Sequence, residues 1–147
     1  MIKYLITGML IAGASYASVT VKDVHDVYRN LINANGLIMA PILVIDNSTE
    51  INGRYRNWQV HITTGMMRKL KNRDELALVL GHELTHWING DTYSHYSVEY
   101  RADKGGAFLS EHAGYSKCHG AKLFRWLPNH NNTTHPDNRL RYKRICK

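Results

Sequence analysis

The apolar positions of this chain divide it into helical stretches and two short strands. A first helix is predicted over residues 21–34, closed by Gly36, and an apolar strand follows at 42–46. A second strand is expected near 58–63, because Val60 and Ile62 alternate there with polar residues. Further helices are expected around 66–70, 73–89, 94–111, 117–127 and 137–145. These elements predict an α+β fold that is mostly helical, with a small antiparallel sheet beside the helix at 73–89.

The helix expected beside the sheet has clear signals at both ends. Asn72 is a candidate N-cap, and Glu75 three residues later has the spacing of a capping box. Gly90 and Asp91 give a stop signal. Between these ends, residues 76–80 form an almost continuous apolar run, which indicates a helix that is buried on most sides.

Two histidines and a glutamate lie near the end of this helix, in the pattern H-E-x-x-H. His82 and His86 are four residues apart on one helical face, so both can reach one metal ion. Glu83 is close enough to accept a proton from a water molecule on that metal. Polar side chains on a buried helix need partners, and a bound metal supplies one. The pattern therefore predicts a zinc site of the kind that catalyses hydrolysis.

A hydrolytic zinc site has three protein ligands and leaves the fourth position for water. The metzincin pattern is excluded, because Asn89 and Thr92 stand where it requires glycine and histidine. A cysteine ligand upstream is also excluded, since both cysteines come after the motif. Glu99, thirteen residues after His86, fits a glutamate ligand from a following helix, and His95 is the alternative.

The motif and the residues after it resemble a known family of zinc peptidases. H-E-x-x-H is followed by E-x-x-A-D-x-x-G at 99–106, which resembles the gluzincin metallopeptidases that include the CAAX prenyl proteases and bacterial envelope quality-control proteases. Other similar segments, in the same order, are 51–53 with 60–67, 113–115, and 134–136 followed by Arg141. The resemblance runs from about Ile42 to Arg144 and implies a zincin-like domain. Gly53 and Arg101 depart from it, because the family commonly has alanine at the first position and many bacterial members are acidic at the second.

The resemblance implies roles for particular side chains. It implies three ligands for one zinc ion, which are His82, His86 and Glu99. Glu83 would be the general base, and Asp103, one helical turn after Glu99, would orient a ligating histidine. Candidates for stabilising the oxyanion are His135, Arg141, Tyr93 and Tyr96, of which the first two are also candidates for contacting the substrate.

These roles predict a zinc-dependent endopeptidase in which Glu83 assists the attack of zinc-bound water on a peptide bond. We expect its substrates to be unfolded or misassembled envelope proteins, as the resemblance implies. Two alternatives stay open: a zinc-binding envelope assembly factor or chaperone with little proteolysis, and a cell-wall peptide hydrolase. Zinc is inferred from a set of two imidazoles and one carboxylate, which iron or cobalt can also occupy.

Residues 1–17 have the pattern of a secretory signal peptide. Lys3 gives a short positive region, residues 4–14 are largely apolar, and Ser15 and Ala17 are the small residues that a signal peptidase requires. The apolar stretch is short for a membrane span, which favours cleavage after Ala17 over an uncleaved anchor. This predicts a periplasmic or secreted protein in which residues 18–147 form a single catalytic domain.

The two cysteines matter because of this predicted compartment. In an oxidising compartment Cys118 and Cys146 are expected to form a disulfide, and the alternative is two free thiols. The bridge would close a loop that contains His135 and Arg141, and loop-closure entropy alone would stabilise the fold by about 3 kcal/mol.

The formal net charge of +7 adds one further expectation about partners. Basic residues cluster at 68–73 and 139–147, where they are either solvated surface or sites that attract anionic lipid or wall polymer. Secretion argues against nucleic acid as a partner. We therefore expect a protein or peptide substrate, and a transient association with membrane or envelope complexes.

Overall fold

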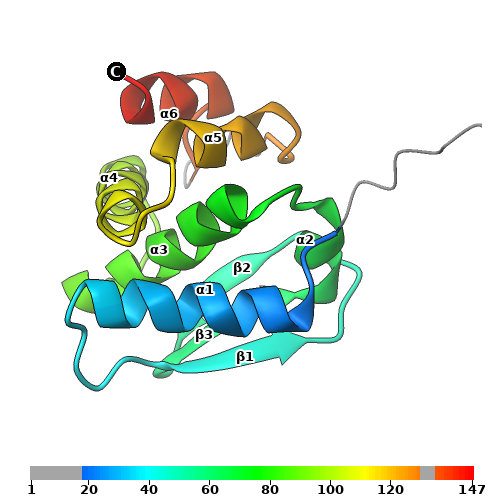
Figure 1. Ribbon diagram of the computed structural model, residues 1–147. Helices are drawn as coiled ribbons and strands as arrows, with labels where there is room; N and C mark the ends of the chain where they lie inside the picture. The colour runs from blue at the N-terminus through cyan, green and yellow to red at the C-terminus, as the bar shows by residue number, and fades with distance from the viewer. Residues whose placement is uncertain (1–17, 130–134) are drawn as a thin grey trace, which may run out of the picture.

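A small sheet and two layers of helices make up the fold of this computed structural model, which describes residues 18–129 and 135–147 (Figure 1). The strands are β1 (Ile42–Asp46), β2 (Gly53–Arg56) and β3 (Gln59–Thr63). The helices are α1 (Val21–Ala34), α2 (Thr64–Lys69), α3 (Arg73–Asn89), α4 (Tyr96–His112), α5 (Lys117–Gly120), the 3₁₀-helix η1 (Ala121–Arg125) and α6 (Asn138–Ile145). Helices α1 and α3 lie over the sheet, and α4, α5 and α6 lie on the other side of α3 (Figure 1). The α+β, mostly helical fold predicted from the sequence is confirmed.

The sheet is mixed rather than wholly antiparallel. Its order is β1-β3-β2, with β2 antiparallel to β3 and β1 parallel to β3. The expectation of an antiparallel sheet is therefore wrong for β1. The chain reverses once in the loop between β1 and β2 and again in the tight turn between β2 and β3, so β3 regains the direction of β1.

Helix α3 runs through the centre of the fold and has the predicted ends. The Asn72 side chain accepts a hydrogen bond from the Glu75 N–H, and Gly90 ends the helix at φ +65°. The capping box itself does not form, because the Glu75 carboxylate accepts from the N–H of Lys71 instead of Asn72. The apolar run at 76–80 is buried, as predicted for a helix that is covered on most sides.

Helices α3 and α4 approach until their backbones touch. A Cβ atom at Gly106 would lie 2.6 Å from the His82 nitrogen, and one at Gly81 would lie 2.8 Å from the Gly106 carbonyl oxygen. Only glycine permits such an approach on both sides of the contact. This crossing places the first two turns of α4 next to the motif histidines.

The C-terminal part of the chain packs as short helices above α3. The helix expected at 117–127 is divided into α5 and η1, and α6 packs on η1 with the Arg141 guanidinium 4.4 Å from the Phe124 ring centre. Cys118 and Cys146 are free thiols in the structure, so the disulfide stays a prediction. The expected signal peptide lies outside the described residues. No helix within 18–129 and 135–147 is long and apolar enough to cross a membrane.

The glycine contact gives a direct test of the fold. Alanine normally stabilises a helix interior relative to glycine. At Gly106 we expect the reverse, because the new methyl group collides with the α3 backbone. Gly106→Ala should lower the free energy of unfolding by about 3 kcal/mol, measured by urea unfolding. Lys104→Ala, at an exposed position of the same helix, is the matched control and should cause no loss. A stable Gly106→Ala protein would contradict the backbone contact.

Candidate metal centre

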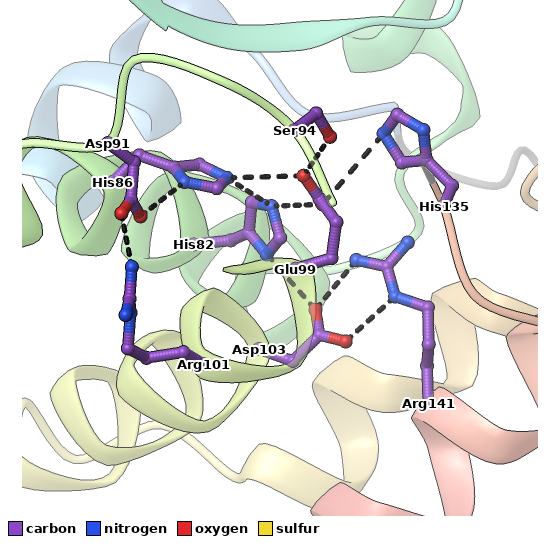
Figure 2. Close-up of polar contacts among 9 residues, drawn as sticks. All are labelled: His82, His86, Asp91, Ser94, Glu99, Arg101, Asp103, His135 and Arg141. Atoms are coloured by element: carbon purple, nitrogen blue, oxygen red, sulfur yellow. Dashed lines mark hydrogen bonds and ion pairs between the residues drawn. The ribbon is translucent and has the colours of Figure 1, made fainter. Parts of the chain in front are cut away.

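Three side chains from two helices converge where α3 meets α4 (Figure 2). His82 and His86 come from α3, and their Nε2 atoms lie 3.0 Å apart. The Glu99 carboxylate comes from the first turn of α4 and lies 3.3 Å from His82 Nε2 and 3.8 Å from His86 Nε2. One ligand atom from each of these residues lies within 4.8 Å of the others. The sequence-predicted triad is thus assembled in one place.

The outer face of His82 is held by a buried ion pair. Its Nδ1 lies 3.0 Å from Asp103 Oδ1, and Asp103 also accepts hydrogen bonds from Arg141 Nε and Nη2 at 2.8 and 2.6 Å. Burial of Asp103 raises its pKa, but the hydrogen bonds from Arg141 and His82 outweigh it and lower the pKa to about 2. Asp103 therefore contacts a motif histidine, which is the position that the resemblance implied, and Arg141 is its further partner.

The outer face of His86 is held by a second arrangement of the same kind. His86 Nδ1 lies 3.0 Å from Asp91 Oδ2, and the other oxygen of Asp91 accepts a hydrogen bond from Arg101 (Figure 2). Each motif histidine thus contacts an aspartate that an arginine holds in turn. The sequence indicated Asp91 only as part of the signal that ends the helix, and its contact with His86 was not predicted. The sequence signal for Asp91 is its position directly after the Gly90 cap.

The hydrogen bonding at the centre fits a bound cation. When each Nδ1–H donates to its aspartate, the neutral imidazoles present the lone pairs of both Nε2 atoms to the same point. Glu99 Oε2 is buried and accepts no hydrogen bond from the described residues, whereas Oε1 accepts one from Ser94 Oγ at 2.6 Å. The two Nε2 atoms and this oxygen face one another in a buried site, which is unfavourable unless a metal ion or a proton on His82 lies between them. Two imidazoles and one carboxylate suit a zinc ion.

The remaining candidates from the sequence lie at different distances from this centre. Glu83 is buried on α3, next to the ligands, and lines the cavity. His135 Nε2 lies 3.8 Å from Glu99 Oε2. Tyr93 is exposed at the rim, and Tyr96 is partly exposed on the first turn of α4. His95 is the N-cap of α4, where its Nδ1 lies 3.1 Å from Ser97 Oγ, so Glu99 and not His95 joins the two motif histidines.

Two hollows meet at the centre and form one cleft. The larger, of about 620 Å³, extends toward η1 and is lined mainly by apolar side chains, among them Met66, Leu78, Val79, Leu123 and Phe124. The smaller, of about 340 Å³, lies between β2 and the loop that contains Thr92 and Tyr93. Both hollows are lined by His82, Glu83, Glu99 and His135. A molecule in the cleft would therefore cross the candidate metal ligands.

Comparisons with known proteins agree with this geometry. The chain matches the model of Peptidase family M48 over residues 18–98, more than half of its length. It is also 27% identical over 85 residues to the CAAX prenyl protease 1 homolog of Arabidopsis thaliana. That alignment covers 52% of this chain and 20% of the plant protein, so the chain spans about a fifth of that relative's length. The family match includes both motif histidines and Glu83 and ends one residue before Glu99.

The second histidine–aspartate–arginine arrangement can be tested by metal binding. Asp91→Asn should weaken zinc binding by about 10- to 100-fold. A neutral amide orients His86 less well than a carboxylate and makes its Nε2 a less basic metal ligand. Competition with a chromophoric chelator measures this affinity. The control is Asp26→Asn, an aspartate on α1 that pairs with Lys22 far from the centre. Equal zinc affinities in all three proteins would contradict a role for Asp91.

The metal-free protein should show a pH dependence that comes from His82. Burial of His82 lowers its pKa, but the contacts with Asp103 and Glu99 outweigh it and raise the pKa to about 10. The unfolded value is near 6.5. The stabilisation by protonated His82 is therefore complete below about pH 6.5 and is lost as the pH rises toward 10. Urea unfolding in chelator should show a loss of up to about 1.4 kcal/mol per pH unit across this range.

The variant His82→Gln isolates this contribution. It lacks the titrating imidazole, so its free energy of unfolding should fall less than that of the parent between about pH 7 and 9.5. The difference should be up to about 1.4 kcal/mol per pH unit. Parallel curves for the parent and the variant would contradict the raised pKa.

Proposed function

The chain belongs to peptidase family M48, and we therefore propose that it is a zinc-dependent endopeptidase. Metallopeptidase activity follows from the family. The observation that carries the proposal is the convergence of the Nε2 atoms of His82 and His86 and the buried Oε2 of Glu99 in an open cleft, beside the Glu83 carboxylate. His82, His86 and Glu99 would hold one zinc ion. Held there, a zinc ion would act as a Lewis acid for a peptide carbonyl and would lower the pKa of water at the site.

Glu83 is proposed as the general base. It follows His82 directly on α3 and faces the cleft, where it can accept a proton from the attacking water and return it to the leaving amine. A Cβ atom on Gly53 would lie 3.7 Å from Glu83 Oε1, which shows how closely β2 passes this carboxylate. The scissile bond of a peptide along β2 would therefore lie within reach of Glu83.

We propose different roles for His135 and Arg141. His135 is partly exposed in the cleft beside Glu99, so it is the candidate donor to the oxyanion. Arg141 directs Nε and Nη2 to Asp103 and is buried, so it acts through Asp103 on the orientation of His82. Arg141 is thus proposed as a positioning residue rather than a substrate contact.

An extended polypeptide is the substrate that this cleft suits. β2 is one of the two edge strands of the sheet and its residues line both hollows, so its free edge can pair with a peptide backbone. The larger hollow would accept a bulky apolar side chain of that peptide. Extended backbone and accessible apolar side chains are properties of unfolded proteins. We infer unfolded or misassembled envelope proteins as substrates, together with the periplasmic or secreted location that residues 1–17 predict.

Cleavage of unfolded casein by the zinc-loaded protein tests the proposal. Glu83→Gln should keep one zinc per chain and lose at least about a thousandfold in rate, because it removes the proton acceptor without removing a ligand. Glu111→Gln, an exposed glutamate on α4, is the matched control and should cleave like the parent. Fragments would be followed by mass spectrometry and zinc by elemental analysis.

Two other outcomes would contradict the endopeptidase proposal. Binding of zinc and of unfolded casein without cleavage by the parent would favour a zinc-holding assembly factor. Clearing of purified cell-wall sacculi by the parent, with casein intact, would favour a wall hydrolase.

A further inference from the structure

Four large apolar side chains are exposed together at the end of the sheet where β1 begins. They are Ile38 (84% exposed), Met39 (77%), Ile42 (68%) and Trp58 (57%). Ile38 and Met39 belong to the loop between α1 and β1, and Trp58 belongs to the turn between β2 and β3. The Ile42 N–H donates to the Trp58 carbonyl at 3.0 Å, which joins the two segments. We refer to these four residues as the apolar tip; the loop and the start of β3 lie side by side in Figure 1.

The backbone of the apolar tip is held in an unfavourable conformation. Within the described ranges, the non-glycine residues with positive φ are Met39 (59°), Asn57 (49°) and Trp58 (60°), and all three lie at this tip. Glycine adopts this conformation without strain, as it does at Gly90. At Asn57 and Trp58 the two-residue hairpin turn between β2 and β3 requires this conformation, but tryptophan is an unfavourable residue for it, as methionine is at Met39. Met39 directs its side chain into solvent, and Trp58 is largely exposed although its ring centre lies 6.0 Å from that of Trp87.

The two segments that form the apolar tip contain basic residues and no acidic residue. The segments 27–45 and 51–73, which contain the loop and the turn, hold no aspartate or glutamate. Arg56, two residues before Trp58, is exposed and makes no ion pair with any described residue. The whole chain carries a net charge of +7. The tip therefore combines exposed aliphatic side chains and one tryptophan with a neighbouring arginine that has no ion pair among the described residues.

We propose that the apolar tip docks the protein on an anionic membrane surface. Tryptophan and aliphatic side chains partition into the boundary between headgroups and acyl chains, while arginine is attracted to anionic lipid. A protein partner would satisfy the apolar side chains as well, but it would not explain the absence of acidic residues from both segments. The charge complementarity favours lipid.

Docking would place the cleft near the membrane. β2 runs from Gly53, beside Glu83, to the turn at Trp58, a distance of roughly 15 Å at the rise of a strand. A polypeptide that leaves the bilayer next to the bound protein would therefore come within reach of the β2 edge. This consequence rests on the proposed peptidase function, whereas the membrane binding itself does not.

Vesicle binding by the full chain, in its Glu83→Gln form, tests the docking without any need for activity. The probes are vesicles of phosphatidylcholine with and without phosphatidylglycerol, with brominated acyl chains in a parallel set. We expect binding that requires phosphatidylglycerol and weakens with salt, and quenching of tryptophan fluorescence by the brominated lipid. The quenching should be lost in Trp58→Tyr, because Trp58 is the exposed tryptophan at the tip.

A matched pair of double variants separates the tip from general hydrophobic binding. Ile38→Ser with Met39→Ser should weaken partition about tenfold or more. Val21→Ser with Leu140→Ser removes exposed apolar side chains from α1 and α6 and should leave partition unchanged. Circular dichroism and zinc content confirm that each variant is folded.

Three results would overturn the proposal. Equal quenching in the parent and Trp58→Tyr would mean that another part of the chain, such as the apolar segment 4–14, enters the membrane. Equal partition of the two double variants would mean that the tip has no special role. A folded parent without vesicle binding would leave a protein surface as the partner. Failure of the casein experiment leaves these results unaffected, so the two proposals fail separately.

Discussion

The contact between the backbones of α3 and α4 is the constraint on which the site depends. Because Gly81 and Gly106 have no side chains, the helices cross at a distance that larger residues would prevent. Glu99 lies on α4 two turns before this contact and reaches the inner nitrogen of His82, while Asp103 lies one turn before it and reaches the outer nitrogen. A wider crossing would separate the carboxylate of α4 from the imidazoles of α3, and the candidate metal site would be lost while both helices remained intact.

The two histidines are held by matched arrangements of unequal strength. Arg141 and Asp103 are both buried, so their interaction is little screened and breaking it would leave an uncompensated buried charge. The Arg101 side chain is 54% exposed and that of Asp91 is 7% exposed, so solvent weakens this second ion pair. His82 is therefore oriented more rigidly than His86. The buried pair also joins α6 to the candidate metal centre, so the position of the C-terminal helix affects the orientation of His82.

Secondary structure was predictable wherever local signals decided it. The ranges 21–34, 42–46 and 73–89 agree with the structure, because caps and hydrophobic periodicity act over a few residues. β2 was not predicted as a strand, since Gly53, Arg54 and Arg56 lack the apolar alternation that marks one. The parallel pairing of β1 with β3 was not predictable either, because it depends on how two separate reversals place strands that are distant in sequence.

The sequence by itself determined the chemistry of the site, and the tertiary structure decided how that chemistry is supported. A helical repeat of 3.6 residues places His82 beside His86, and Glu99 beside Asp103, whatever surrounds them. Two sets of contacts join segments whose separation depends on the helix crossing. Asp91 contacts His86 and Arg101, and Asp103 contacts Arg141. The exposed tip also needed the tertiary structure, because burial and backbone conformation at Met39 and Trp58 are set by packing that no local pattern encodes.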